Sequence, residues 1–205
     1  MPKKTFLNLP NEKRERIENA AIEEFATYTF RDASINRIIS SVGIAKGSFY
    51  QYFNDKKDLY KHIVDLSGML KMSYLTSKLS EMQGAEFFDI LEAFYITGIE
   101  FSKKYTKLSK IGDDLVKGGD RAFREEILGD SLKKSNEFIE GLLMHGMKQG
   151  SINPEINISM ISYLITTFSV NLNEYYIMSG ANDENAMTLI KEMLNLLRNG
   201  IEVKE

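Results

Sequence analysis

Residues Ser34 to Phe53, SINRIISSVGIAKGSFYQYF, predict two short helices that are joined by a glycine turn. Ile35, Ile38 and Ile39 recur at helical spacing and can bury one face of the first helix. Gly43 follows them, and glycine ends a helix without steric cost because it has no Cβ to oppose a left-handed turn. Two helices joined in this way indicate a helix-turn-helix, which places its second helix in the major groove of DNA.

The second helix, expected from about Ala45 to Tyr52, carries side chains that suit a nucleic-acid surface. Phe49 and Phe53 are four residues apart and can face the core, which turns the other positions outward or toward the rim. Lysine supplies charge for a phosphate or a guanine, glutamine can pair with a base edge, and tyrosine can donate to phosphate. The positions expected to face outward or toward the rim are Lys46, Gly47, Ser48, Tyr50, Gln51 and Tyr52.

A longer stretch, Ile17 to Leu59, resembles the N-terminal domain of the TetR/AcrR family of transcriptional regulators. The resemblance rests on RIENAAIEEFA (Arg16 to Ala26), on the helix-turn-helix, and on GIAKGSFYQYFNDKKDLY (Gly43 to Tyr60). It implies an all-α fold in two domains. Residues 1–55 would form a three-helix DNA-binding domain with the motif at about 34–53, and residues 56–205 a larger helical bundle for effector binding and dimerisation.

Four positions depart from the family pattern. Thr29 stands where the family usually has glycine, which predicts either strain of about 1 kcal/mol or a different end to the first helix. Ile39 and Val42 replace the usual small alanines, so the first two helices are expected to pack slightly wider, unless a neighbouring side chain is smaller in compensation. Ala45 stands where a serine or threonine commonly caps the recognition helix.

Residues that flank the motif are expected to position it. Ser34 suits the side-chain cap of the first helix of the motif. The N-terminus of this helix can bind a DNA phosphate, or Ser34 can serve only as a structural cap. Asp55 suits the cap of the following helix, and Lys56 resembles the family's phosphate-contacting lysine. Lys3 and Lys4 are expected on a mobile arm that touches the minor groove or stays in solvent. The residues predicted to contact DNA are Ser34, Arg37, Lys46, Gly47, Ser48, Tyr50, Gln51, Tyr52 and Lys56.

Composition agrees with an all-α globular protein. The chain has 205 residues, of which 43% are hydrophobic, and no proline lies between Pro10 and Pro154, so long helices are permitted. The absence of cysteine excludes disulfides, thiolate catalysis and cysteine-ligated metal sites. The two histidines, His62 and His145, have no companion ligand at helical spacing, so we expect no metal, no cofactor and no enzyme.

The charge is distributed unevenly along the chain. Residues 1–62 hold 11 Lys and Arg against 8 Asp and Glu, a net charge of +3, whereas residues 63–205 hold 15 against 21, a net charge of −6. This asymmetry favours DNA binding by the N-terminal part, although +3 also fits an ordinary solvated surface. Residues 1–10 predict no signal peptide, and the uncharged stretch 156–173 is too rich in polar residues for a membrane span. A cytoplasmic protein without a membrane partner is expected.

Beyond the motif, periodicity predicts five further helices, over 55–80, 86–104, 121–149, 156–178 and 183–199. The last two carry apolar stripes that are expected either to pair in a four-helix dimer interface or to face only their own core. The residues predicted for the dimer interface are Met160, Ile161, Leu164, Ile165, Phe168, Met187, Ile190, Leu194 and Leu197.

The resemblance also implies a small-molecule effector that is bound in the C-terminal bundle. An apolar lining would suit a lipophilic or aromatic effector, although most of these side chains could simply be core. The candidates are Phe94, Phe101, Tyr105, Phe138, Phe168, Asn171 and Tyr175. The sequence therefore predicts a homodimeric repressor of a near-palindromic double-stranded DNA operator, released by its effector. The alternative is a helix-turn-helix module that binds a partner protein instead of an operator.

Overall fold

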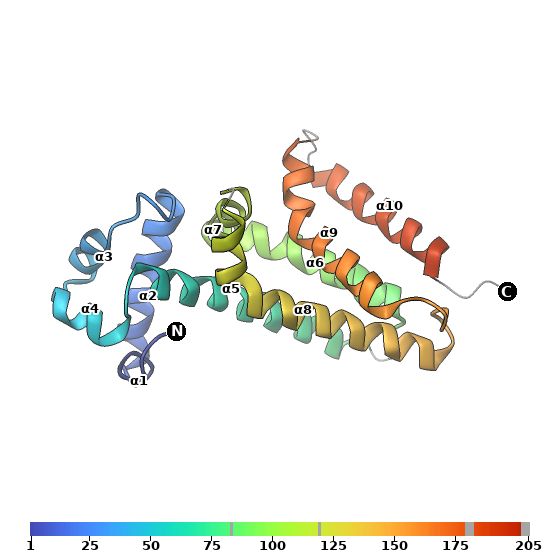
Figure 1. Ribbon diagram of the computed structural model, residues 1–205, viewed down its shortest axis with the longest axis horizontal. Helices are drawn as coiled ribbons and strands as arrows, with labels where there is room; N and C mark the ends of the chain where they lie inside the picture. The colour runs from blue at the N-terminus through green and yellow to red at the C-terminus, as the bar shows by residue number, and fades with distance from the viewer. Residues whose placement is uncertain (83, 119, 179–182, 202–205) are drawn as a thin grey trace. The chain divides into compact units, whose positions relative to one another are not determined.

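The computed structural model describes residues 1–82, 84–118, 120–178 and 183–201, without the side chains of 173–178 and 183–186. The described part is an all-α fold (Figure 1), which confirms the fold class expected from the sequence. Its helices are α1 (Lys4–Leu7), α2 (Asn11–Thr27), α3 (Ile35–Val42), α4 (Lys46–Tyr52), α5 (Lys56–Ser80), α6 (Phe87–Lys104), α7 (Thr106–Lys117), α8 (Arg121–Gln149), α9 (Ile158–Met178) and α10 (Asp183–Ile201).

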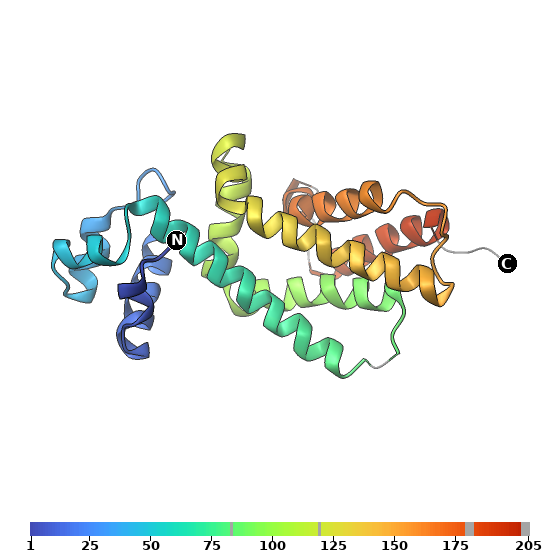
Figure 2. The ribbon, with the colours of Figure 1, turned by 60° about the horizontal axis from the view of Figure 1, so that its bottom comes forward.

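The chain divides into two compact units. Unit 1 comprises residues 1–70 and 104–128, and unit 2 comprises residues 71–103 and 129–205. The long helices α5 and α8 each begin in unit 1 and end in unit 2, as their continuous ribbons show (Figure 2). The five helices expected beyond the motif are α5, α6, α8, α9 and α10, with ends that differ by at most two residues. The short helices α1 and α7 were not predicted.

Unit 1 has an aromatic core that ties α1 to α4 and α5. Phe6 is fully buried, and its ring centroid lies 4.7 Å from that of Phe53 and 5.2 Å from that of His62. Tyr60 of α5 meets Phe25 of α2 edge to face, with centroids 4.9 Å apart. Its hydroxyl donates to a backbone carbonyl of α7, and burial raises the pKa of this phenol. Helix α7 also contacts α2, so residues distant in sequence complete the core of unit 1.

Three helix ends in unit 1 were predicted from neighbouring residues, and the structure agrees with two of these predictions. Gly43 adopts a left-handed conformation with φ of 75°, which confirms the predicted glycine turn. The Asp55 carboxylate accepts the N–H of Asp58 at 2.8 Å, which confirms the predicted cap. The prediction that Ser34 caps α3 with its side chain is wrong, because its side chain makes no cap hydrogen bond. Its backbone N–H instead donates to the carboxylate of Glu24 at 2.6 Å.

Helix α2 ends just before Thr29, the position where the family usually has glycine. Tyr28 leaves the helix in an extended conformation, with φ of −121°, and no described residue other than glycine has a positive φ. The Thr29 hydroxyl donates to the Asp32 carboxylate at 2.8 Å, which ties the following turn. Helix α2 therefore closes differently, and the expected alternative of backbone strain does not occur here.

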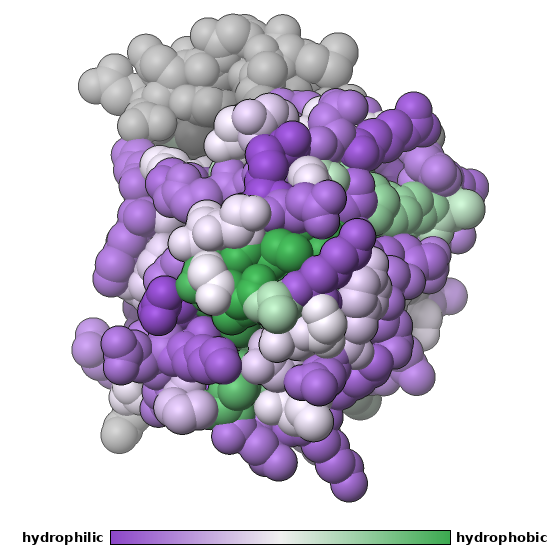
Figure 3. Space-filling view, turned by 90° about the vertical axis from the view of Figure 1, so that its left-hand side faces the viewer, coloured by the Kyte–Doolittle hydropathy of each residue, from purple (hydrophilic) through white to green (hydrophobic). Residues whose placement is uncertain are grey.

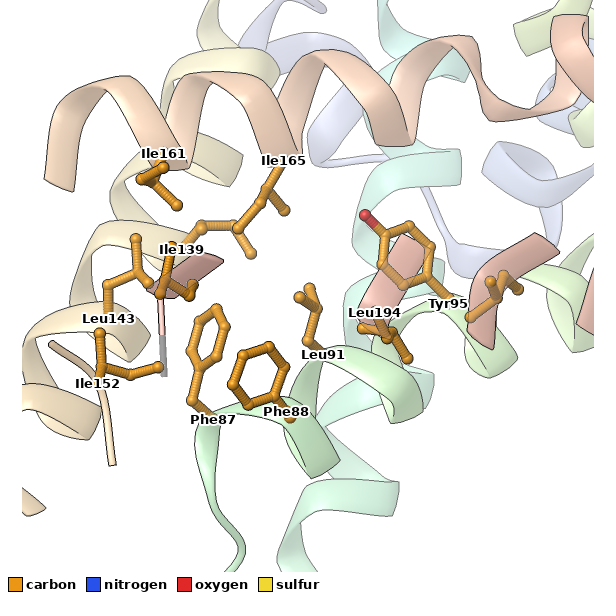
Figure 4. Packing of buried hydrophobic residues seen from close by; sticks show 12 residues of the cluster. Phe87, Phe88, Leu91, Tyr95, Ile139, Leu143, Ile152, Ile161, Ile165 and Leu194 are labelled. Carbon is orange, nitrogen blue, oxygen red and sulfur yellow. The ribbon is translucent and has the colours of Figure 1, made fainter. Parts of the chain in front are cut away.

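Unit 2 is a bundle in which α6, α8, α9 and α10 share one apolar core. Figure 4 shows Phe87, Phe88 and Leu91 of α6 facing isoleucines and leucines of the other helices. Tyr95 is buried in the same cluster and shares a 3.0 Å hydrogen bond with Ser169, while burial raises its pKa to about 12. No helix in the described part of the chain has both the length and the apolar character that crossing a membrane requires.

Four of the residues predicted for a dimer interface belong to this core instead. Ile161, Ile165, Ile190 and Leu194 are at most 8% exposed and pack inside unit 2, so their assignment to an interface is wrong. Helices α9 and α10 carry both buried and exposed apolar residues. Sequence spacing alone did not separate the face in the core from the exposed apolar face. Phe168, Met187 and Leu197 also pack against this core, partly buried.

Candidate nucleic-acid interface

Helix α4 presents one polar face and one buried face. Phe49 is fully buried, whereas Lys46, Gly47, Tyr50 and Gln51 are exposed. This arrangement confirms the expected orientation of the helix. At the end of unit 1 that carries α3 and α4, hydrophilic side chains cover most of the surface around a small apolar patch (Figure 3).

Tyr52 does not share the exposed face, and the prediction that it turns outward is wrong. It is 6% exposed, and its ring packs at 6.1 Å from that of Phe6. Position 52 lies three residues after Phe49, so a helix places both on the same side. The sequence reasoning used only the spacing of four between Phe49 and Phe53 and missed the spacing of three.

Helix α3 also exposes polar residues that the sequence reasoning overlooked. Asn36 and Ser40 are exposed polar residues one helical turn apart, on the side of α3 away from its buried isoleucines. The signal was available, since Ile35, Ile38 and Ile39 define the apolar side and positions 36 and 40 lie outside it. Asparagine can pair with an adenine edge, and serine can donate to phosphate.

The N-terminal segment is not a mobile arm, because it closes the C-terminal end of α4. The backbone N–H of Lys3 donates to the carbonyl of Tyr52 at 2.8 Å, and its ammonium donates to the carbonyl of Tyr50 at 2.8 Å. The Thr5 hydroxyl donates to the carbonyl of Gln51. The last carbonyls of a helix have no partner within it, so these three donors satisfy groups that would otherwise face solvent.

A buried carboxylate holds the start of α3. Glu24 of α2 is 7% exposed and accepts the Ser34 N–H together with the guanidinium of Arg37, whose Nε lies 2.9 Å from Oε1. Arg37 also donates to the Asp32 carbonyl at 2.8 Å and stacks 4.1 Å from the centroid of the Tyr28 ring. Its hydrogen bond to Glu24 raises the pKa of Arg37. Arg37, predicted to contact DNA, is thus engaged within the protein.

Lys56 is similarly engaged. Its ammonium donates to the carbonyls of Ala33 at 2.7 Å and of Arg31 at 3.0 Å, and it lies 4.8 Å from the centroid of the Phe30 ring. Burial lowers the pKa of Lys56, in spite of nearby carboxylates. The predicted phosphate contact would have to share this ammonium with the loop that precedes α3.

The predicted effector residues do not all come together. Phe94, Phe138 and Phe168 pack, partly buried, around the core of unit 2, and Phe101 is fully buried in the same unit. Tyr105 belongs to unit 1. The amide of Asn171 is used locally, since it donates to the Thr167 carbonyl at 2.7 Å. The side chain of Tyr175 lies outside the described residues.

A surface hollow of about 450 Å³ lies in unit 2 and includes none of these candidates. Its lining comes from the end of α5, the following turn and α6. The residues are Lys78, Met82, Gly84, Ala85, Asp89, Glu92, Ala93 and Ile96.

Comparison with known proteins connects this geometry to a family. Residues 17–63 match the model of bacterial regulatory proteins of the tetR family. YdgC of Bacillus subtilis, an uncharacterised HTH-type transcriptional regulator, is 25% identical over 194 residues, 93% of each chain. A solved TetR family transcriptional regulator from Chloroflexus aurantiacus is 26% identical with a TM-score of 0.65, and all of both chains is covered. The regulator FadR from Bacillus subtilis, solved in complex with stearoyl-CoA, is 18% identical with a TM-score of 0.72, over 91% of this chain and 98% of that one.

Proposed function

We propose that this chain, which belongs to the TetR family of bacterial transcriptional regulators and is not an enzyme, is a repressor of a near-palindromic operator. It would bind as a homodimer in the cytoplasm, with residues 1–55 on the DNA and residues 56–205 for effector binding and dimerisation. The observation that carries the proposal is the polar face of α4, which stands exposed opposite fully buried phenylalanines.

The direct contacts are assigned by exposure and chemistry. Lys46 meets a phosphate or a guanine, Gln51 pairs with a base edge, and Tyr50 donates to phosphate. Gly47 has open space where a Cβ would stand, so its own fold does not require glycine, and the exposed backbone can approach the DNA closely. Ser34 and Ser48 complete the set, since the Ser34 hydroxyl is not used as a cap within the described residues.

The homodimer is supported by apolar residues that unit 2 leaves exposed. Met160, Tyr163 and Leu164 of α9 are 53%, 65% and 51% exposed, and Leu196 of α10 is 76% exposed. Neighbouring exposed apolar residues favour a protein interface over solvent. A two-fold dimer would present its two α4 helices to successive major grooves about 34–36 Å apart, which is why the operator should be a near-palindrome.

The effector is proposed to be lipophilic or aromatic and to bind among the helices of unit 2. The core there offers aromatic rings, and FadR of Bacillus subtilis, which has the same fold, was solved with stearoyl-CoA. Thr97, Asn136 and Thr166 each have a buried side-chain oxygen without a hydrogen-bond partner in the described part of the chain. A ligand that also carries a polar group would form hydrogen bonds with such atoms. A buried polar atom without a hydrogen bond lowers the stability of the folded state by about 1–3 kcal/mol.

The effector would release DNA through α5, the helix that runs from unit 1 into unit 2. A tilt of this helix would change the separation of the two recognition helices, so that they no longer match adjacent grooves. The operator affinity would then fall by the difference between the effector's affinities for the two states.

The test is capture of sheared DNA from the source genome at moderate salt, followed by sequencing of what is retained. The wild type should recover a near-palindrome, and a variant with Lys46→Ala and Tyr50→Ala should not. Lys133→Ala is the matched control, since this lysine side chain is 78% exposed in unit 2 and its loss should leave recovery unchanged. Equal recovery by all three proteins without sequence preference, or none by any, would instead favour a module that binds a partner protein.

A further inference from the structure

Two charged side chains, Glu24 and Lys56, hold the loop that connects α2 to α3. We propose that Glu24 and Lys56 are positioning residues for operator recognition, which fix the start of α3 from inside the protein. On this proposal Lys56 acts on the loop and not on a phosphate. The inference rests on the proposed function, because operator binding is one of its readouts.

Glu24 supplies the cap that Ser34 does not. Its carboxylate accepts the Ser34 N–H at 2.6 Å, at the N-terminus of α3, where a negative charge is favoured by the helix dipole. A carboxylate that is 7% exposed needs compensating donors, and Arg37 of the same helix provides them through Nε and Nη2. The buried carboxylate of Glu24 on α2 therefore fixes both Ser34, the N-cap residue of α3, and the side chain of Arg37, about one turn further along the helix.

Lys56 holds the other side of the same loop. Its ammonium bridges the carbonyls of Arg31 and Ala33, two residues apart, and the Phe30 ring lies against it. The Ala33 carbonyl and the Ser34 N–H belong to one peptide group, so Lys56 of α5 and Glu24 of α2 hold its two sides. Because Lys56 is the first residue of α5, this bridge also connects the helix that leaves unit 1 to the start of α3.

Salt dependence separates a positioning lysine from a lysine that contacts phosphate. Each phosphate contact adds about 0.9 to the slope of log affinity against log salt, because it releases condensed counterions. A lysine that acts only on the loop contributes to affinity without contributing to this slope. Lys46, assigned to the DNA surface, serves as the reference for a direct contact.

The experiment compares Lys56→Met, Glu24→Gln, Lys46→Met and Lys57→Met in operator titrations at several salt concentrations. Lys56→Met and Glu24→Gln should weaken binding about tenfold or more at every salt concentration, with the wild-type slope, since each removes a charge-assisted hydrogen bond. Lys46→Met should reduce the slope by about one. Lys57→Met is the matched control, because this neighbouring lysine pairs with Glu126 at 2.6 Å and does not touch the loop.

Amide hydrogen exchange of the free protein gives a readout that does not need DNA. Lys56→Met and Glu24→Gln should speed exchange in residues 34–38 but not in α9, whereas Lys57→Met should leave both unchanged. If the wild type binds no operator, the proposed function fails, while the positioning role is still decided by exchange. Lys56→Arg, which retains a cation and donors, keeps the test usable if Lys56→Met does not fold. A slope reduced by about one in Lys56→Met, or unchanged affinity and exchange, would overturn the proposal.

Discussion

The closure of α4 by the N-terminal segment leads to a prediction that a mobile arm would not make. Replacing Lys3 by methionine keeps the aliphatic stem but removes the ammonium that donates to the Tyr50 carbonyl at 2.8 Å. Lys4 offers a matched control, since Lys4→Met removes the same charge one residue along. The Lys4 side chain is exposed and, among the described residues, makes no hydrogen bond or ion pair.

The magnitude follows from the place of Lys3 at a helix end. A cation near the last turn of a helix stabilises it by about 0.3–1 kcal/mol, and the hydrogen bond to the carbonyl belongs to the same interaction. Lys3→Met should therefore destabilise α4 by about 1 kcal/mol, whereas Lys4→Met should change it by less than about 0.5 kcal/mol. A loss of 1 kcal/mol corresponds to about fivefold faster opening of the α4 amides.

Amide hydrogen exchange over residues 46–53 measures this opening, with the exchange of α9 as an internal reference. Operator titration of the same two variants adds a second readout, because a minor-groove arm would make both lysines contribute to affinity and to its salt dependence. Equal exchange in the two variants would refute the capping role. Equal losses of affinity with unchanged exchange would restore the arm that the sequence suggested.

Three further predictions concern backbone, core and surface. Gly47→Ala should stabilise α4 by up to about 1 kcal/mol and yet weaken operator binding. Gly43→Ala should destabilise the protein by about 1 kcal/mol, because φ is 75° there. Urea unfolding measures both changes in stability and DNA titration measures the affinity; unchanged operator affinity in Gly47→Ala, or unchanged stability in Gly43→Ala, would contradict the respective prediction. Phe6→Ala should lower the free energy of unfolding by about 3–5 kcal/mol, in contrast to about 0.5 kcal/mol or less for the half-exposed Leu7→Ala, as denaturant melts would show. Leu164→Asp should convert the dimer to folded monomers in light scattering, whereas Ile165→Asp, at a core position that is 1% exposed, should unfold unit 2; a dimer that survives Leu164→Asp would contradict the proposed interface.

Local features of this fold were predictable because a few neighbouring residues determine them. Gly43 ends α3 in the left-handed conformation that its missing Cβ permits, and Asp55 caps α5 through the N–H three residues on. The long helices were found from the apolar period alone, since no proline interrupts them. In each case the energy that decides the structure lies within one or two helical turns of sequence.

The features that were missed depend on partners far away in the chain. Ser34 has the right side chain for a cap, yet Glu24, ten residues earlier, occupies its N–H. Lys3 lies 47 residues from the carbonyl that holds its ammonium, so no local pattern could report that contact. Tyr52 is buried because α1 brings Phe6 against it, and α1 is too short to be read from periodicity.

The recognition helix thus has little stability of its own. Helix α4 has seven residues, includes a glycine, and follows Ala45, which provides no side-chain cap. Helices of this length are unstable in isolation, so α4 must be held by its buried phenylalanines and by the donors of residues 3 and 5. The same reasoning applies to α3, whose start depends on Glu24 and Lys56. Helices α3 and α4 depend on contacts with neighbouring segments, so a movement of those segments would shift them. Lys56, which holds the loop before α3, is the first residue of α5. The contacts that build the DNA surface are therefore also the ones through which α5 could alter it.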